Sequence, residues 1–487
     1  MNEKKGMCFE LFSNGVAFCL FGSTGDLAKK KIIKSLFDLF SKKYIRENFF
    51  VINVASRDYD DESFRKYVSE VLKTEGVSES DSFLQRNYYF KLDYSDQESY
   101  KRLVSRISEL EKKYEQNVKN RIFYLAIPPS SIKQTISNIN SSTDLKDGKN
   151  KIIIEKPYGE NFCSATLLNR FIKKLDIEDN IYRIDHYLGK EGVLNILIVK
   201  ALNYLFYSTF NNKFIDNIQV TVYENEGVDD RGKYYEGIGA FKDMITHVLE
   251  MLSFLVIPPP SDMRAGEIKS SKLEFFKNII IPDNDFISKN YVKAQYLAAE
   301  NIKGYKEIKN VSPNSFTETF VAFRLETKMD YLKGVPFYIK FGKRMKEKLT
   351  RIDVVYKKSD NDFSKKYFID EPNVLTFVIQ PDVGIKFSFN AKSAGAKFCV
   401  ESTELKKDFG SSNLIISDYE RLIIDAVNGD KTLFLSSDEM SCMWRYIKRI
   451  DETFIKDGSR LEFYKPGEVI ESADNLIKKD GKKWIYI

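Results

Sequence analysis

Residues 16–31, VAFCLFGSTGDLAKKK, place an uninterrupted apolar run directly before a glycine turn and a lysine-rich helical stretch. A turn of this kind at a helix N-terminus presents backbone N–H groups that suit a pyrophosphate. Gly22 allows the tight turn, Gly25 lets phosphates approach, and Ala28 permits close packing of the helix on the strand. The spacing is GxxGxxA rather than the commonest dinucleotide fingerprint, so an ordinary strand–helix turn is the alternative.

The chain continues this alternation of strand and helix over its first part. Apolar strand-like runs occupy 49–56, 87–94, 121–129 and 151–159, and helical stretches begin near Asp61 and cover about 96–118. Strands that are apolar throughout are buried on both faces, and their alternation with helices predicts a parallel, doubly wound sheet. We therefore expect an α/β Rossmann-type dinucleotide-binding domain over residues 1–183.

The pattern changes after residue 183 to longer strands in which apolar and polar residues alternate. These strands are expected over 217–227, 319–327, 336–343, 374–381 and 383–392, with helices over 234–256 and after Ser417. Successive strands with segregated helices predict an α+β domain on a large, mostly antiparallel sheet over residues 184–487.

The composition narrows the classes of partner and compartment. The 487 residues are 43% hydrophobic and 30% charged, and 76 basic residues face 70 acidic ones, so we expect no nucleic-acid partner. No apolar run approaches the length of a membrane span, and the N-terminal residues lack the apolar core of a secretory signal. Five dispersed cysteines without a CxxC pair favour a reducing, cytoplasmic location over a disulfide frame or zinc site.

The end of the second strand, Ala55-Ser56-Arg57, bears on the choice of dinucleotide. An NAD site usually carries an acidic residue here to hold the ribose hydroxyls, whereas arginine offers a permanently charged donor fork for a 2′-phosphate. Arg57 therefore favours NADP, and a surface loop arginine is the alternative.

Histidine occurs twice in the chain, and each is a candidate for proton transfer or anion binding. His186 lies in RIDHYLGKE (183–191), where Tyr187 and Lys190 add donors that suit a phosphate dianion. His247 lies on the expected helix of the second domain, and Asp185 suits the carboxylate that orients such a base. A structural role is the alternative for either histidine. We expect no metal site, because neither histidine has a second ligand at ligand spacing.

These motifs resemble the glucose-6-phosphate dehydrogenase family. GSTGDLAKKK (22–31), RIFYLAIPP (121–129), IIIEKPYG (152–159) and RIDHYLGKE occur in the family's order and spacing, and RIDHYLGKE is the most specific of them. The resemblance continues through GVPFYIKFGK (334–343), VIQP (378–381), YERLIIDAVNGDKTLF (419–434) and the closing pattern Ala473, Leu476, Gly481 and Trp484.

The resemblance implies oxidation of the C1 hydroxyl of glucose 6-phosphate to 6-phosphogluconolactone with NADP, the first step of the oxidative pentose phosphate pathway. It implies His247 as general base, Asp185 as its orienting carboxylate, and a homodimer or homotetramer that uses the large sheet. It also implies a proline after the site lysine, here Pro157, often with a cis peptide bond. The implied NADP-binding residues are Gly22, Ser23, Thr24, Gly25, Asp26, Leu27, Lys31, Arg57, Tyr124 and Lys156. The implied substrate-binding residues are Lys156, His186, Tyr187, Lys190, Glu224, Asp243, Lys343, Lys348 and Gln380.

Two departures from the family pattern qualify this assignment. Members usually read Asp-x-x-Gln-Asn-His, but this chain reads Asp243-Met-Ile-Thr-His247, one residue shorter, which rotates Asp243 by about 100° on a helix. Lys348 stands where many members carry arginine, so it offers one donor group instead of a fork.

Two alternatives to this activity stay open. A different phosphosugar dehydrogenase is one, and a catalytically weak, NADP-binding sensor or scaffold is another. We also expect no second, structural NADP of the kind bound by some eukaryotic members. Leu349, Asp353, Val378 and Ile379 stand where cationic partners for its phosphates are expected.

Overall fold

The computed structural model describes residues 15–77, 80–116, 120–156, 158, 162–261, 264–367, 371–410, 416–457 and 460–486. They form two compact units, which are described separately. The first unit combines the chain up to Gly189 with Arg264–Gly266 and Ile416–Met440. The second combines Lys190–Met263, Glu267–Ile415 and Ser441–Ile487.

The first unit is built on a sheet of seven strands among the described residues, in the order β15-β6-β5-β4-β1-β2-β3. Every neighbouring pair is parallel except β15 with β6. The expected parallel, doubly wound sheet is therefore confirmed, with one antiparallel strand added at its edge. The strands are β1 (Ala17–Phe21), β2 (Phe50–Ala55), β3 (Asn87–Lys91), β4 (Arg121–Leu125), β5 (Asn150–Ile154), β6 (Ile181–Ile184) and β15 (Phe434–Leu435).

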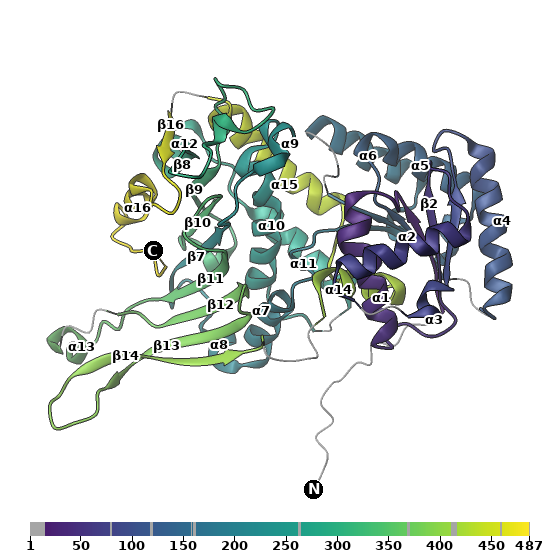
Figure 1. Cartoon of the computed structure of the whole chain (residues 1–487). Helices are drawn as coiled ribbons and strands as arrows, with labels where there is room; N and C mark the ends of the chain where they lie inside the picture. The colour runs from purple at the N-terminus through teal and green to yellow at the C-terminus, as the bar shows by residue number, and fades with distance from the viewer. Residues whose placement is uncertain are drawn as a thin grey trace, which may run out of the picture. The chain divides into compact units, whose positions relative to one another are not determined.

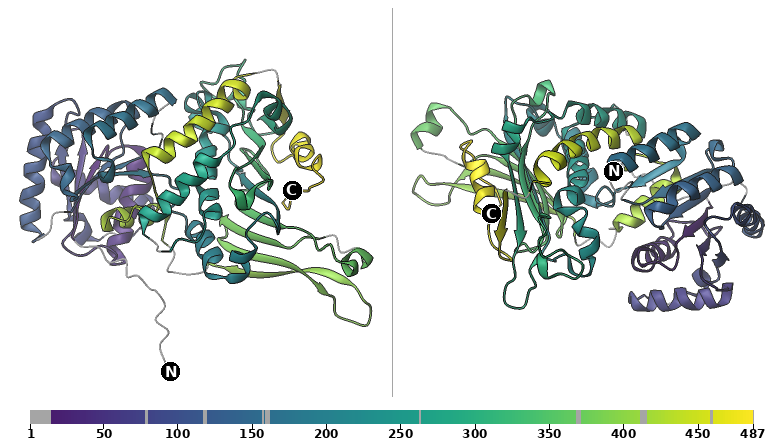
Figure 2. Two further views of the ribbon diagram at one scale, coloured as in Figure 1. Left: turned by 180° about the vertical axis from the view of Figure 1, so that it is seen from behind. Right: turned by 90° about the horizontal axis from the view of Figure 1, so that it is seen from above.

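Helices pack on both faces of this sheet (Figures 1 and 2). Because helices cover both faces, strands β1, β4 and β5 are buried along their whole length. The helical segments are η1 (Ala28–Ile32), α1 (Ile33–Ser41), α2 (Asp61–Thr74), α3 (Asp81–Leu84), α4 (Gln97–Lys113), α5 (Pro129–Ser142), η2 (Leu145–Asp147), α6 (Phe162–Leu175), η3 (Glu178–Asn180) and α14 (Asp418–Asn428).

A late segment of the chain returns to the first unit. Ser417 caps α14 through a capping box with Glu420, which confirms the helix expected after Ser417. The helix packs against α1, and the strand β15 that follows pairs with β6. The compact units thus differ from the expected ranges 1–183 and 184–487. Because β15 pairs with the edge strand β6, residues 416–440 belong to the first unit. Those ranges stay a prediction for the domains.

The second unit is built on a sheet of nine strands within the described part, ordered β14-β13-β12-β11-β7-β10-β9-β8-β16. Most neighbouring pairs are antiparallel, whereas β10 with β7 and β16 with β8 are parallel. The large, mostly antiparallel sheet is confirmed. Its strands are β7 (Ile215–Tyr223), β8 (Tyr291–Tyr296), β9 (Phe320–Leu325), β10 (Phe337–Gly342), β11 (Leu349–Tyr356), β12 (Val374–Gln380), β13 (Gly384–Lys392), β14 (Val400–Asp408) and β16 (Leu461–Tyr464).

The helix expected over 234–256 is two helices, α9 (Gly232–Glu236) and α10 (Gly239–Val256). The break falls before Gly239, whose φ of 68° lies in the left-handed region. Alpha-helix α10 packs on β9 and β10, where Phe241 contacts Phe323. Figure 2 (right) shows α16 on the other side of this sheet.

The other helical segments lie in the stretches of chain that connect strands or, for α16, after β16. Among the described residues, no helix has the length and apolar character needed to cross a membrane. The segments are α7 (Glu191–Leu202), α8 (Tyr204–Thr209), η4 (Asp229–Arg231), α11 (Ala265–Asn278), α12 (Asn284–Asn290), η5 (Tyr305–Glu307), η6 (Asp330–Leu332), α13 (Asp362–Tyr367), α15 (Ser437–Ile450), η7 (Asp451–Ile455) and α16 (Glu471–Lys478).

Candidate active site

The glycine loop after β1 has the backbone that the sequence predicts. Gly22 adopts φ 74°, and a Cβ atom there would lie 2.1 Å from the carbonyl oxygen of Ala126, so only glycine fits. Gly25 N–H donates to the Gly22 carbonyl at 2.9 Å and closes the turn. Residues 24–27 are partly or fully exposed at the start of the helix, where their backbone can face a ligand.

Ser23 supplies a test of whether this loop fits a dinucleotide. Its side chain is fully buried, yet its hydroxyl has no hydrogen-bond partner among the described residues. A buried hydroxyl without a partner is costly unless a bound group satisfies it. The narrow glycine turn and this hydroxyl fit a pyrophosphate held at the helix N-terminus.

Two basic residues flank the loop. Arg57 is exposed two residues beyond β2, and its own carbonyl accepts a hydrogen bond from the Tyr89 hydroxyl. Its guanidinium is therefore carried on an anchored backbone. Lys31 is exposed within η1, a π-helical turn that continues directly into α1. Such turns occur often at functional sites.

Tyr124 is fully buried on β4, and its hydroxyl donates to the carboxyl group of Glu155. Burial, together with the nearby charges of Asp185 and Asp418, raises the pKa of Glu155 to about 7 against the opposing effect of the Tyr124 hydrogen bond. Glu155 directly precedes Lys156, so the buried pair fixes the backbone that carries this lysine. Direct contact of Tyr124 with a cofactor stays a prediction, and Pro157 with its peptide bond lies outside the described residues.

The RIDHYLGKE segment forms a tight turn at the carboxyl end of β6. Asp185 is 1% exposed, its carboxylate accepts from Tyr187 N–H at 3.0 Å, and its carbonyl accepts from Leu188 N–H at 3.0 Å. The His186 ring is half-buried with its centroid 4.9 Å from that of Tyr187. Lys190 is the N-cap residue of α7 (Glu191–Leu202). The carboxyl ends of parallel strands are where ligands bind in open α/β sheets.

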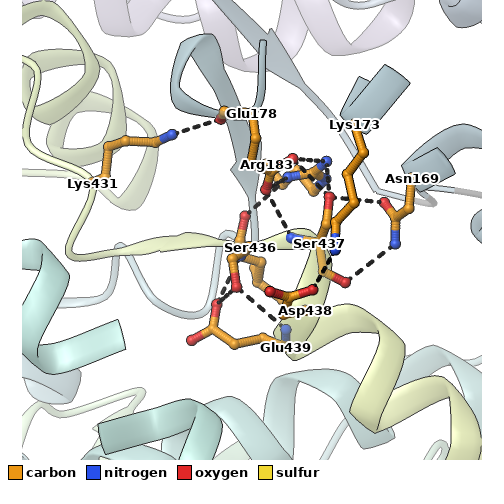
Figure 3. A network of polar contacts seen from close by, with 10 residues as sticks. Asn169, Lys173, Glu178, Arg183, Lys431, Ser436, Ser437, Asp438 and Glu439 are labelled. Atoms are coloured by element: carbon orange, nitrogen blue, oxygen red, sulfur yellow. Dashed lines mark hydrogen bonds and ion pairs between the residues drawn. The ribbon is translucent and has the colours of Figure 1, made fainter. Parts of the chain in front are cut away.

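Arg183, the first residue of this segment, has a different task. It is fully buried and donates two hydrogen bonds to Glu178 (2.8 and 3.0 Å) and one to Ser437 (2.8 Å), as Figure 3 shows. Ser437 Oγ and N–H also donate to the same carboxylate, at 2.7 and 2.8 Å. These hydrogen bonds, called the clasp below, join β6 to the segment after β15 and so fix the strand that directly precedes Asp185.

The second unit brings three of the predicted substrate residues together. Lys343 follows β10, is 3% exposed, and forms an ion pair with Glu224, which follows β7. Its ammonium also lies 3.8 Å from the carboxylate of Asp243 on α10. Asp243 thus reaches the cluster despite the one-residue shortening before His247. The cluster offers one cation and two acceptors, a set suited to sugar hydroxyl groups.

His247 lies one turn further along α10 and is 4% exposed. It belongs to the second unit, whereas Asp185 and His186 belong to the first. The pairing of Asp185 with His247 therefore stays a prediction.

Strand register places the two remaining residues at the same end of the second sheet. Tyr223 aligns with Gly342 and with Leu349, and Thr350 aligns with Gln380. Gln380 donates to the Thr350 hydroxyl at 2.9 Å, and Lys348 is exposed just before β11. The register thus brings the residues that follow β7 and β10, and the last residue of β12, to the same end of the sheet.

Comparison with known proteins tests the resemblance. The model of the glucose-6-phosphate dehydrogenase NAD binding domain matches residues 19–195, and that of the C-terminal domain matches residues 197–485. The chain belongs to the glucose-6-phosphate dehydrogenase family. Glucose-6-phosphate 1-dehydrogenase of Streptococcus pneumoniae is 35% identical over 97% of each chain. That of Bacillus subtilis is 36% identical over 96% of this chain and 97% of its own.

A solved glucose-6-phosphate dehydrogenase in complex with glucose 6-phosphate is similar in structure as well. It is 28% identical, with a TM-score of 0.88 over 97% of this chain and 99% of that chain. Family membership and the two-part fold are therefore confirmed. Against the family pattern, Thr246 replaces the usual asparagine, and its buried hydroxyl has no partner within the described part of the chain.

Sequence reasoning did not single out Glu155 or Arg183 as residues that shape the site. Glu155 could have been noticed in the sequence, because it is an acidic residue directly after the apolar run III at 152–154. Arg183 leaves a weaker one, because its partner Ser437 lies more than two hundred residues away and nothing local points to it.

Proposed function

We propose that this family member oxidises the C1 hydroxyl of D-glucose 6-phosphate to 6-phospho-D-glucono-1,5-lactone and transfers hydride to NADP. The observation that carries the proposal is the full-length similarity to glucose-6-phosphate 1-dehydrogenases, one of them solved with that sugar phosphate. The Glu224–Lys343–Asp243 cluster gives the second unit a polar set for the sugar. The names of these relatives favour an enzyme over a sensor or scaffold.

The protein's part in the chemistry is to hold the sugar and move one proton. NADP, when bound, supplies the hydride acceptor at its nicotinamide ring. In this proposal an imidazole nitrogen of His247 accepts the proton of the C1 hydroxyl as the hydride departs. Asp185 orients the imidazole and offsets the positive charge that it gains.

The remaining residues bind the substrate. His186, Tyr187 and Lys190 supply donors for the phosphate, and Lys156 and Lys348 add positive charge. Glu224, Asp243, Lys343 and Gln380 contact the sugar hydroxyls. These roles are supported by the family motifs and by the clustering of Glu224, Asp243 and Lys343 in the second unit.

NADP rather than NAD is the proposed cofactor. Gly22–Leu27 hold the pyrophosphate, and Arg57 pairs with the 2′-phosphate. Asp58, the acidic residue next to Arg57 in the sequence, forms an ion pair with Lys91 at 2.5 Å. The negative charge of Asp58 is therefore offset by Lys91, and the positive charge of Arg57 can serve a phosphate.

The proposed assembly is a cytoplasmic homodimer or homotetramer. The second unit exposes apolar side chains along α7 and α8, with Leu202 74% and Tyr204 80% exposed. Strand β14 lies at the edge of the large sheet and is exposed along most of its length. Exposed apolar surface beside an open strand edge favours association with a second copy.

One NADP per subunit is proposed, as the sequence predicts. Asp353 is fully buried and paired with Arg351, which neutralises the basic residue nearest to it. Lys340 donates to the Tyr486 carbonyl at 2.8 Å and lies 4.2 Å from the Trp484 ring centroid. Contacts within the protein thus occupy Arg351 and Lys340, two cationic groups of the large sheet.

The proposal is tested by initial rates with a panel of sugar phosphates and both dinucleotides. Glucose 6-phosphate with NADP should give the highest kcat/KM. A different phosphosugar as best substrate would replace the proposed substrate. Tight NADP binding without turnover of any sugar phosphate would favour the sensor.

A further inference from the structure

Helix α10 carries both Asp243 and His247, and its first turn is held from outside the helix. Ile238 stands at the N-cap and offers no side-chain hydrogen bond. Instead, Phe241 N–H donates to Glu318 Oε1 at 2.9 Å, and Ala240 N–H donates to the Glu318 carbonyl at 2.9 Å. One residue thus satisfies two of the backbone donors that a helix N-terminus leaves open.

Gly239 is what admits Glu318 to this position. Its φ is 68°, and a Cβ atom there would lie 2.4 Å from Glu318 Oε1. Any other residue would both strain the backbone and collide with the carboxyl group. Glu318 itself is 1% exposed, so water does not replace this contact.

The opposite end of α10 is held in a matching way. Lys200 on α7 is 2% exposed and donates to the carbonyls of Leu255 and Ile257, at and just beyond the last turn. A hydrogen-bond acceptor at the N-terminus and a donor at the C-terminus both satisfy backbone groups that the helix leaves open. The helix is therefore fixed at each end by a buried residue from another part of the chain.

The segment that contains Glu318 also fixes Lys343. The Thr319 carbonyl, one residue on, accepts from Lys343 N–H at 3.0 Å, and Phe320 aligns with Gly342 across β9 and β10. Lys343 in turn lies 3.8 Å from Asp243. Residues 318–320 therefore set the positions of Asp243 and Lys343, two of the three members of this cluster.

We propose that Glu318 is a positioning residue that fixes the first turn of α10 and so aligns Asp243 with Lys343. Its carboxyl oxygen acts as a hydrogen-bond acceptor, a task that a glutamine oxygen can also perform. Burial raises the pKa of Glu318 to about 7, against the Phe241 hydrogen bond, which agrees with a task that does not need full charge. The kinetic part of the test rests on the proposed function.

The test compares Glu318→Ala and Glu318→Gln in the full-length protein. In Glu318→Ala we expect kcat/KM for glucose 6-phosphate to fall roughly 10–100-fold through misplacement of Asp243, largely in KM. KM for NADP should stay within about 2-fold, because the dinucleotide loop is in the first unit. Glu318→Gln should recover kcat/KM to within about 3-fold of the wild type.

Asp283→Ala is the matched control, because Asp283 caps a different helix of the same unit through Phe286 N–H at 2.8 Å. It should leave both KM values unchanged. Equal kinetic effects of Glu318→Ala and Asp283→Ala, or no recovery in Glu318→Gln, would overturn the proposal.

Amide hydrogen exchange supplies a readout that does not depend on turnover. Residues 240–243 should exchange at least about 10-fold faster in Glu318→Ala than in the wild type or Glu318→Gln. Unchanged exchange would overturn the positioning role whatever the substrate. Altered exchange in a protein that does not oxidise glucose 6-phosphate would uphold the role and reject the proposed function.

Discussion

Replacing Arg183 with methionine tests how the fold fixes the turn that carries Asp185 and His186. Arg183 is fully buried and donates to Glu178 at 2.8 and 3.0 Å and to Ser437 at 2.8 Å (Figure 3). Methionine fills much of the space but leaves the Glu178 carboxylate without its cation.

The magnitude follows from the burial of the pair, in which Arg183 is fully buried and the Glu178 side chain is 31% exposed. Removing one partner costs about 3–5 kcal/mol in a fully buried ion pair and about 0–1 kcal/mol in an exposed one, so we expect about 2–4 kcal/mol here. For a domain of this size each kcal/mol lowers Tm by roughly 2–4 °C, so the first unit should melt about 4–16 °C lower. Activity should fall as well, because Asp185 directly follows β6.

Lys146→Met is the matched control, since Lys146 pairs with Asp176 in the same unit but both side chains are more than half exposed. Such surface pairs contribute about 0–1 kcal/mol. Differential scanning calorimetry of both variants measures the difference. If Arg183→Met melts within about 2 °C of Lys146→Met, the clasp does not stabilise the first unit as argued.

The remaining predictions concern pH, the cofactor, the base and stoichiometry. Partial burial alone raises the pKa of Glu178, but the charge of Arg183 and hydrogen bonds from Arg183 and Ser437 outweigh it and lower the pKa to about 2. Because that pKa lies below the unfolded value of 4.5, ionised Glu178 stabilises the fold fully above pH 5, and this stabilisation is lost as pH falls through 2. Urea unfolding should therefore show a free energy of unfolding that is lower at pH 3 than at pH 5 by about 1–3 kcal/mol, and Arg183→Met should lack this difference. Arg57→Ala should reduce the preference for NADP over NAD by roughly 10–150-fold in kcat/KM, and equal values in the wild type would contradict the role of Arg57. His247→Asn should lower kcat by ~10²–10⁴ with little effect on binding, whereas His186→Asn should act mainly on KM; near-wild-type turnover of the first would reject the base. Equilibrium dialysis should find one NADP bound per subunit. Two bound NADP molecules per subunit would show that a structural site is present.

The sequence predicts the first unit well because its signals are local. The apolar strands, the turn at Gly22 and the helix after Ser417 each depend on a few neighbouring residues, and the structure confirms all three. The return of β15 to β6 could not be predicted, because edge pairing between residues far apart leaves no local pattern.

The candidate site divides in the same way. RIDHYLGKE identifies its residues by motif, but the position of Asp243 depends on tertiary packing. One missing residue predicts a rotation on an isolated helix, whereas the break before Gly239 and the Glu318 cap set where α10 begins. The buried partners Glu318 and Lys200 could not be predicted from the sequence either, since each lies more than fifty residues from the helix end that it contacts.

The most direct test of the central claim is the initial rate of NADPH formation from glucose 6-phosphate and NADP by the full-length protein. We predict kcat/KM of at least about 10⁴ M⁻¹s⁻¹, within the usual range for enzymes acting on their own substrate. Unphosphorylated glucose should react at least about 100-fold more slowly, because it lacks the phosphate that His186, Tyr187 and Lys190 are proposed to bind. No NADPH formation by folded protein that binds both ligands would contradict the proposed activity.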